Sequence, residues 1–277
     1  MAPRIESWDD FLWVAEAVDE ETGQFRYTRV VATAEEDDDD MVFHGYLYKR
    51  QADVSLSEAT GALARIPDDE IFPRCSRSLG LTRAPDELQP CTYIKRPNLA
   101  LYDQLLLARC DVVVDVVRKE LLEEAQALEA VTAGDSSSSS SPHPNFIGYY
   151  GCRVRRGHIT GIMLDRHPFD LHGYLKSGHV LGDKACFMRG LASAVRYLHA
   201  LGWAHNDLTP SNVLVSDDQS AILAGFGAAR RIGERLGANR GTEGWTEHDV
   251  DDYTTSKAEH DVEALARLNA WLDDPTF

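Results

Sequence analysis

The chain has 277 residues, 43% of them hydrophobic, which is enough for one large domain or for two lobes. Its formal net charge of −17 argues against nucleic acid or an anionic membrane surface as the main partner, because both would be repelled. A protein partner is expected instead, and the charge permits a basic one, although solubility alone also explains such a charge.

The amino-terminal part of the chain predicts β-structure. Three segments rich in β-branched and aromatic residues predict strands: 11–18, 24–32 and 41–49. The acidic run 35–40 repels itself and is expected in a solvated loop. A short helix is expected at 55–65, capped by Ser55 or Ser57. Residues 73–90 are punctuated by prolines and predict an irregular connection.

The remainder of the chain predicts a mixture of helices and strands. Further strands are expected at 91–95, 146–150, 159–164, 213–215 and 221–224. Long helices are expected at 101–131, 183–201 and 257–272. Residues 134–142 include six consecutive serines and predict a flexible insertion that cannot bury a core.

The cysteine spacing and the hydropathy of the chain indicate in which cellular compartment the protein is expected. The five cysteines are widely spaced and form no Cys-x-x-Cys pair, so neither a disulfide framework nor a zinc site is predicted. The amino terminus has no apolar segment of signal-peptide type, and no run approaches about 18 apolar residues. We therefore expect an intracellular protein, cytoplasmic or nuclear.

The strongest chemical pattern is the stretch 205–212, which reads His-Asn-Asp-Leu-Thr-Pro-Ser-Asn and precedes the apolar run 213–215. It resembles the catalytic loop of protein kinases, where the Asp accepts the proton of the substrate hydroxyl and the Asn holds a metal ion. By this resemblance Asp207 and Asn212 are the expected catalytic residues, and Asn212 is also the expected metal ligand. The alternative is that both side chains only bind the loop backbone together.

Other parts of the kinase pattern are altered. Where an Asp-Phe-Gly motif would hold Mg²⁺, the chain reads Ala-Gly-Phe-Gly at 224–227, so Gly225 replaces the carboxylate. The glycine-rich loop that covers the phosphates is missing. The resemblance thus implies weakly bound ATP, and Mg²⁺ with one ligand missing. Asn206 replaces the usual Arg, so activation-loop phosphorylation is not expected to be the switch. Thr209 replaces the Lys that steadies the transferring phosphoryl group.

The nucleotide-pairing lysine of the family is matched by Lys95, at the end of a short strand. An ammonium on a strand neutralises the α- and β-phosphates and is positioned by a helix carboxylate. Glu124 is the expected carboxylate, with Glu120 and Glu123 as fallbacks. Lys49 is a rival lysine, and Lys95 and Glu124 could also be ordinary surface charges.

The stretch 162–167 resembles the last small-lobe strand running into the hinge. The resemblance places Leu164 behind the adenine and Leu214 beneath it, while Asp165 and His167 offer backbone hydrogen bonds to the base. The alternative is that both leucines merely fill a core.

An apolar spine and its anchor are also implied by the resemblance. His205, Phe226 and Leu128 correspond to the spine. Asp261 is expected to accept backbone N–H bonds from the catalytic loop, or to act as a plain helix cap.

The resemblance runs from about residue 91 to the end. It is closest to small kinase-like proteins of filamentous fungi, which carry Gly-Thr-x-Gly-Trp and a Trp-Leu helix, matched here at 241–245 and 270–272. It implies an α+β, bilobal kinase-like fold with three parts: a β-rich extension at 1–90 completing the small lobe, the small lobe and hinge at 91–167, and a shortened large lobe at 168–277.

The functional hypothesis rests on the missing metal ligand. A loss of about 4 kcal/mol of electrostatic stabilisation would slow phosphoryl transfer about a thousandfold. We therefore expect a pseudokinase that acts by binding, with residual nucleotide affinity. The alternatives are a divergent Ser/Thr-kinase-like phosphotransferase using Asp207 and Asn212, and a kinase-fold enzyme repurposed for a small-molecule reaction.

Overall fold

The computed structural model describes residues 3–19, 22–34, 40–87, 91–100, 102, 113–132, 143–237, 239–246 and 249–277. The chain divides into two compact units. Unit 1 contains residues 1–75, 98–118 and 154–160, and unit 2 contains residues 76–97, 119–153 and 161–277. The secondary structure is mixed α+β with a β-rich amino-terminal region, as the sequence predicts.

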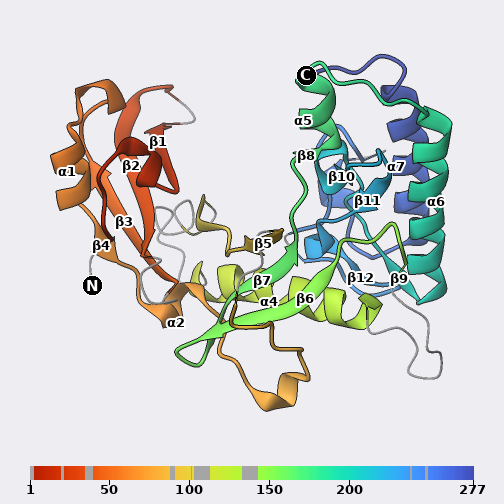
Figure 1. Ribbon diagram of the computed structural model, residues 1–277, viewed down its shortest axis with the longest axis horizontal. Coiled ribbons are helices and arrows are strands. Elements are labelled where there is room, and N and C mark those ends of the chain that lie inside the picture. Colours follow the sequence, from red (N-terminus) through yellow and green to blue (C-terminus); the bar gives the residue numbers. More distant parts are fainter. Residues whose placement is uncertain are drawn as a thin grey trace. The chain divides into compact units, whose positions relative to one another are not determined.

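Unit 1 contains an antiparallel sheet of four strands in sequential order, seen in red and orange in Figure 1. The strands are β1 (Trp13–Val18), β2 (Phe25–Ala34), β3 (Met41–Leu47) and β4 (Ala64–Arg65). The three predicted amino-terminal strands are therefore confirmed. In the part of the chain that the structure describes, these four strands pair only with one another. That residues 1–90 complete a small lobe stays a prediction.

Two short helices accompany this sheet. The predicted helix α1 is shorter than expected, Leu56–Gly61, and Ser55 caps it through a reciprocal pair of hydrogen bonds with Glu58. The second helix, α2 (Asp68–Ile71), is a single turn after Pro67. It was not predicted, because four residues are too few to show a helical period.

The core of unit 1 lies on both faces of its sheet, because the neighbouring β2 residues Val30 and Val31 belong to separate apolar clusters. One apolar cluster contains Val31, Val42, Ile66, Ile71, Phe72, Leu99, Tyr102 and Val117. Arg29 is buried beside it, where its Nη1 donates to the carbonyl of Leu99 at 2.9 Å and its guanidinium lies 4.8 Å from the Trp13 ring centroid. The cation is thus accommodated by hydrogen bonding and by an aromatic face.

The end of the acidic run 35–40 differs from expectation. Asp40 is buried and accepts a hydrogen bond from Thr160 Oγ1 at 2.9 Å, so it does not lie in a solvated loop. A hydroxyl donor offsets part of the cost of burying this carboxylate. The other five residues of the run lie outside the described residues.

Three further sheets are formed in the described part of the chain. One sheet has the order β5-β7-β6, with β5 (Thr92–Lys95), β6 (Tyr149–Arg155) and β7 (His158–Asp165). A second has the order β11-β10-β8, with β8 (Phe169–Asp170), β10 (Val213–Val215) and β11 (Ala221–Leu223). The third pairs β9 (Trp203–Ala204) with β12 (Arg230–Arg231).

The α-helices that follow in the described part of the chain are α4 (Val113–Thr132), α5 (Leu171–Lys176), α6 (Lys184–Ala200) and α7 (Ala258–Trp271). One-turn 3₁₀ helices of the chain lie at Trp8–Asp10, Gln51–Asp53, Arg77–Leu79, Pro210–Asn212, Phe226–Ala228 and Val250–Asp252. The helix containing α4 was expected to begin at 101, but residues 101 and 103–112 lie outside the described residues. The serine-rich insertion 134–142 also lies outside them. Among the helices that the structure describes, none combines the length and apolarity needed to cross a bilayer.

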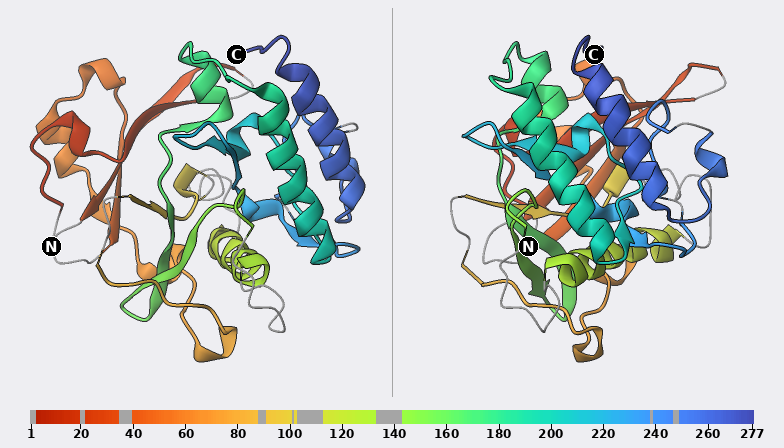
Figure 2. Two further views of the ribbon diagram at one scale, coloured as in Figure 1. Left: turned by 45° about the vertical axis from the view of Figure 1, so that its right-hand side comes forward. Right: turned by 90° about the vertical axis from the view of Figure 1, so that its right-hand side faces the viewer.

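Helices α6 and α7 lie side by side, as both views of Figure 2 show in teal and dark blue. The α6 helix buries residues at helical spacing: Phe187, Leu191, Ala194, Val195 and Leu198. Asp183 caps its start by accepting from the Cys186 N–H at 2.8 Å, and Gly202 follows its end with a left-handed φ of 79°. Lys184 Nζ ties α6 to α7 by donating to the Asn269 carbonyl at 2.7 Å.

One strand boundary was predicted wrongly. The expected strand 146–150 begins only at Tyr149, and Phe146 forms an isolated bridge to Leu223. Phe146 is buried against Phe226 and Tyr197, each at a ring-centroid distance of 5.6 Å. Its apolarity therefore reflects aromatic packing rather than strand pairing.

Candidate functional site

The stretch 205–212 connects β9 to β10, and a buried carboxylate on α7 holds its start. Asp261 Oδ2 accepts from the backbone N–H of His205, and Oδ1 accepts from that of Asn206, both at 2.8 Å. His199 Nε2 also lies 2.8 Å from Asp261 Oδ2. The side chain of Asp261 is 0% exposed. The predicted anchoring of the loop by Asp261 is confirmed.

Asn206 is buried in the same loop, and its side chain forms hydrogen bonds to neighbouring segments. It has a left-handed φ of 62°, a conformation that asparagine tolerates better than most residues. Its Nδ2 lies 3.0–3.1 Å from the Ala204 carbonyl, the Ala228 carbonyl and Ser256 Oγ, and its Oδ1 lies 3.1–3.3 Å from His260 Nδ1 and the Lys257 N–H. The amide therefore joins the loop both to the segment after Phe226 and to the start of α7.

Asp207 is half-buried and is oriented by neutral donors. Its Oδ1 accepts from Thr242 Oγ1 at 2.7 Å. Asn212 Nδ2 donates to Asp207 Oδ2 at 2.9 Å and to the Asp207 carbonyl at 2.7 Å. Within the described part of the chain, no lysine, arginine or histidine forms an ion pair with Asp207. Asp207 and Asn212 thus lie together, as their spacing suggests, and each restrains the other.

Gly225 lies directly beside Asn212. It adopts a left-handed conformation with φ 72° and ψ 48°. A Cβ atom on Gly225 would lie 2.1 Å from Asn212 Oδ1, so the amide oxygen occupies the space where a side chain would begin. Gly225 therefore offers no carboxylate, and the Asn212 amide oxygen partly fills the space where one would begin.

The residues present do not fit the Mg²⁺ clamp of the family. Mg²⁺ is usually held through one or two carboxylates together with phosphate oxygens. Among the described residues, no group of three or more His, Cys, Asp and Glu side chains could hold a metal. Metal binding by Asn212 stays a prediction.

The ion pair that the sequence predicts on α4 and β5 is present. Lys95 Nζ lies 2.7 Å from Glu124 Oε1 and 2.6 Å from Oε2. Their side chains are 35% and 6% exposed, so the carboxylate is nearly buried and the ammonium reaches solvent. The rival Lys49 instead pairs with Glu58 at the surface of unit 1. The contact is as expected, while a role in nucleotide binding stays a prediction.

The two fallback carboxylates have other surroundings. Glu123 forms an ion pair with Arg230, which follows the altered motif at 224–227. Burial raises the pKa of Glu120, and the nearby Lys95 ammonium opposes this shift. Glu124 is therefore the carboxylate that meets the strand lysine.

The hinge residues form a separate group. Leu164 is buried in β7 opposite Tyr93, and Leu214 is half-buried in β10. The Asp165 N–H donates to the Gly148 carbonyl at 2.9 Å. Its carboxylate accepts from Tyr150 Oη at 2.5 Å, which raises the pKa of Tyr150 to about 12. His167 is half-buried. Adenine binding by Leu164, Leu214, Asp165 and His167 stays a prediction.

Aromatic rings stack beneath the loop at the predicted spine. The His205 ring is buried and packs edge-on against Phe226 at 5.3 Å, and its Nε2 lies 2.8 Å from the Ala224 carbonyl. Phe226 and Leu128 are also buried. Phe146 extends the stack and was missed, because its position relative to Phe226 depends on a bridge between distant segments.

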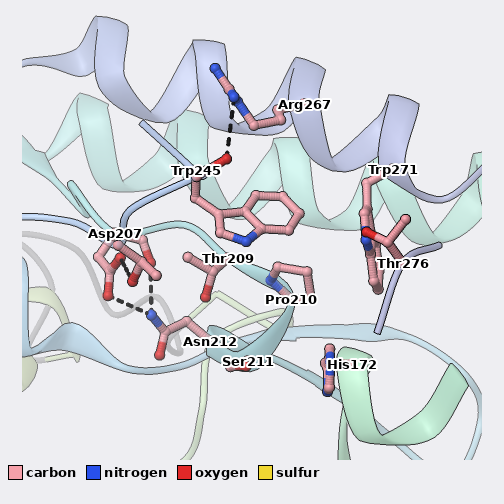
Figure 3. A pocket seen from close by; sticks show the side chains of 12 residues that line it. His172, Asp207, Thr209, Pro210, Ser211, Asn212, Trp245, Arg267, Trp271 and Thr276 are labelled. Atoms are coloured by element: carbon pink, nitrogen blue, oxygen red, sulfur yellow. Dashed lines mark hydrogen bonds between the residues drawn. The ribbon is translucent and has the colours of Figure 1, made fainter. Parts of the chain in front are cut away.

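A cavity of about 710 Å³ opens next to Asp207 (Figure 3). Its lining residues come from the loop, from α5 and α7, and from the segments before and after α7: His172, Asp207, Thr209, Pro210, Ser211, Asn212, Thr242, Gly244, Trp245, Arg267, Trp271 and Thr276. Trp245 and Trp271 pack edge to face at 5.8 Å, and Arg267 Nη1 donates to the Gly244 carbonyl at 3.2 Å. The sequence patterns at 241–245 and 270–272 contain both tryptophans but do not predict that they meet at a cavity.

The half-buried His260 predicts a pH dependence of stability. Burial lowers the pKa of His260 from its usual 6.5, while Asp261 opposes this shift and Lys257 adds to it. His260 therefore takes up its proton at a higher pH in the unfolded chain than in the folded protein, so the free energy of unfolding should fall as the pH drops below about 6.5. Urea unfolding at about pH 7.5 and pH 5.5 measures the drop, which should be smaller in His260→Gln. An equal drop in both proteins would contradict the assignment.

Comparison with known proteins identifies the class to which this geometry belongs. The protein kinase domain model matches residues 109–265, more than half of the chain. The chain belongs to the protein kinase domain family. Domains of this family bind ATP with Mg²⁺ in general.

The curated relatives match over part of the chain. Mitogen-activated protein kinase 15 of Caenorhabditis elegans is 38% identical over 93 residues, 32% of this chain and 20% of that protein. NUAK family SNF1-like kinase 1 of Homo sapiens is 28% identical over 118 residues, 42% of this chain and 18% of that protein. Serine/threonine-protein kinase/endoribonuclease IRE1 of Hypocrea jecorina is 28% identical over 125 residues, 38% of this chain and 10% of that protein. The matched segments span a fifth or less of these relatives.

Proposed function

We propose that this protein is a pseudokinase: it keeps the kinase framework, acts by binding a protein partner, and retains only weak affinity for a nucleotide. The observation that carries this proposal is the pair Gly225 and Asn212. Glycine supplies no metal ligand, and the Asn212 amide oxygen lies where a carboxylate side chain would start. Phosphoryl transfer depends on positioning and on electrostatic stabilisation by the metal, so this loss bears on the chemical step itself.

Calorimetric titration with ATP and ADP, with and without Mg²⁺ or Mn²⁺, tests this proposal. We expect weak binding that changes little when metal is added, because the metal gains no protein carboxylate at position 225. Incorporation of labelled phosphate from γ-labelled ATP into an acceptor protein, abolished by Asp207→Ala, would overturn the proposal.

A divergent phosphotransferase is the second candidate, and two contacts favour it. The Lys95–Glu124 pair is formed and has a solvent-accessible ammonium that could meet phosphates. Thr242 also orients Asp207 beside a cavity large enough for an acceptor. In such an enzyme, the phosphate oxygens of the nucleotide would supply most of the metal ligands.

Replacing Gly225 by aspartate tests whether the nucleotide site lacks only its metal-binding carboxylate. Gly225→Asp should strengthen nucleotide binding in the presence of Mg²⁺ by about tenfold, since one added charged ligand contributes on the order of 1.4 kcal/mol. Aspartate tolerates the left-handed backbone better than most residues, and the flexible Asn212 amide must rotate away.

Gly237→Asp is the matched control for this titration. It adds the same charge to the same segment, at a glycine with open space around its Cβ position. An equal gain in both variants would show a general charge effect. No gain in Gly225→Asp would mean that the metal site is not at this position.

A further inference from the structure

The carboxylate of Asp207 faces the cavity with neutral partners only. Thr242 Oγ1 and Asn212 Nδ2 each satisfy one lone pair of its oxygens, and further lone pairs remain on both. Thr209 lines the same cavity two residues further along and contributes a hydroxyl rather than a cation. A half-buried carboxylate without a cationic partner is electrostatically complementary to an incoming cation.

The cavity lining beside Asp207 also favours a positively charged group. Trp245 presents its indole toward the space that Asp207 and Thr209 border (Figure 3). An indole face attracts ammonium and guanidinium groups, and does so most strongly where water is partly excluded. Arg267 also lines the cavity, and its Nη1 donates to the Gly244 carbonyl. The net charge of −17 adds a long-range field that draws cations to the molecule.

The size and lining of the cavity favour a chain segment over a small ion. About 710 Å³ is far more than one ammonium group needs. Away from Asp207 the lining becomes apolar and aromatic at Pro210, Trp271 and His172. Such a surface can bury the apolar side chains on either side of a basic residue, whereas a free polyamine offers only short methylene segments.

We infer that this cavity docks a basic segment of a protein partner, whose lysine or arginine side chain forms an ion pair with Asp207 and packs on Trp245. The inference rests on the proposed function, because a carboxylate freed from proton transfer can serve as a fixed anion for recognition. The flanking apolar residues of the segment contact Trp271 and His172.

A labelled peptide without hydroxyl side chains provides the test. The probe is a fluorescein-labelled nonapeptide of alanine and leucine with one central lysine, and its matched form has norleucine in place of lysine. Fluorescence anisotropy without nucleotide measures binding to the full chain. We expect the lysine peptide to bind about tenfold more tightly, because only it offers a cation to Asp207.

Two variants locate the binding. Asp207→Asn should weaken the lysine peptide about tenfold, while Asp217→Asn, which makes the same charge change at an exposed turn residue, should leave its affinity unchanged. Thr209→Lys places a cation of the chain's own beside Asp207 and should abolish the preference for lysine over norleucine. Circular dichroism and thermal unfolding confirm that each variant is folded.

The outcomes separate this inference from the proposed function. Peptide binding that is unaffected by Asp207→Asn, or no binding of the lysine peptide, overturns the docking site. Spermidine that binds as tightly as the peptide, and to the same residues, overturns the choice of a protein segment. The probe cannot accept a phosphoryl group, so labelled transfer to a separate acceptor protein counts only against the pseudokinase proposal.

Discussion

Asp261→Ala should lower the free energy of unfolding by about 3–5 kcal/mol, the largest stability effect that we expect from one side chain outside the apolar core. The fully buried carboxylate accepts the backbone N–H groups of His205 and Asn206, and alanine would leave both donors unpaired. Each unpaired buried donor costs about 1–3 kcal/mol. Urea unfolding followed by circular dichroism gives the value.

Two further variants sharpen this measurement. Glu259→Ala removes an exposed carboxylate from the first turn of the same helix and should change stability by about 0.5 kcal/mol or less. Asp261→Asn keeps one acceptor oxygen but turns an NH₂ group toward a donor, so it should fall between alanine and wild type. A loss below about 1 kcal/mol in Asp261→Ala would show that the loop does not depend on this anchor.

Asn206→Ala should lower the free energy of unfolding by about 2–4 kcal/mol. The buried amide contacts five groups that belong to the loop, to the segment after Phe226 and to the start of α7. Alanine would lose these hydrogen bonds and would also be held at a left-handed φ, which costs about 1–2 kcal/mol.

Asn206→Gly separates these two contributions. Glycine accepts the left-handed backbone, so it should recover about 1 kcal/mol relative to alanine while it still lacks the amide. Asn269→Ala, at an exposed position of α7, is the control and should be nearly neutral. If glycine proved as stable as asparagine, the amide contacts would contribute nothing. The Asp261→Ala and Asn206→Ala effects should not add, because the two side chains support one loop.

Regular periodicity made much of the fold predictable from sequence. The apolar spacing along α6 and the β-branched segments of β2 and β3 report burial directly, and they were located within a few residues. Elements of one or two turns were missed at α2 and α5, because their apolar residues are too few to define a period. The burial of Asp40 was missed because it depends on Thr160, which is distant in the chain.

The candidate site was predictable where its residues belong to recognisable sequence motifs. The spacing of Asp207 and Asn212 and the choice of Glu124 for Lys95 follow from motifs, and the structure brings each pair into contact. The cavity walls were not predictable, since Trp245 and Trp271 meet only after α7 has folded against the loop. The five contacts of Asn206 were not predictable for the same reason.

Two adjacent glutamates on one turn of α4 form ion pairs with different strands. Glu124 pairs with Lys95 of β5, and Glu123 pairs with Arg230 of β12. A rotation of α4 that released one ion pair would displace the neighbouring carboxylate as well, since both are carried by the same rigid helical turn. A displacement of this helical turn would therefore disturb its contact with β5 and its contact with β12 together.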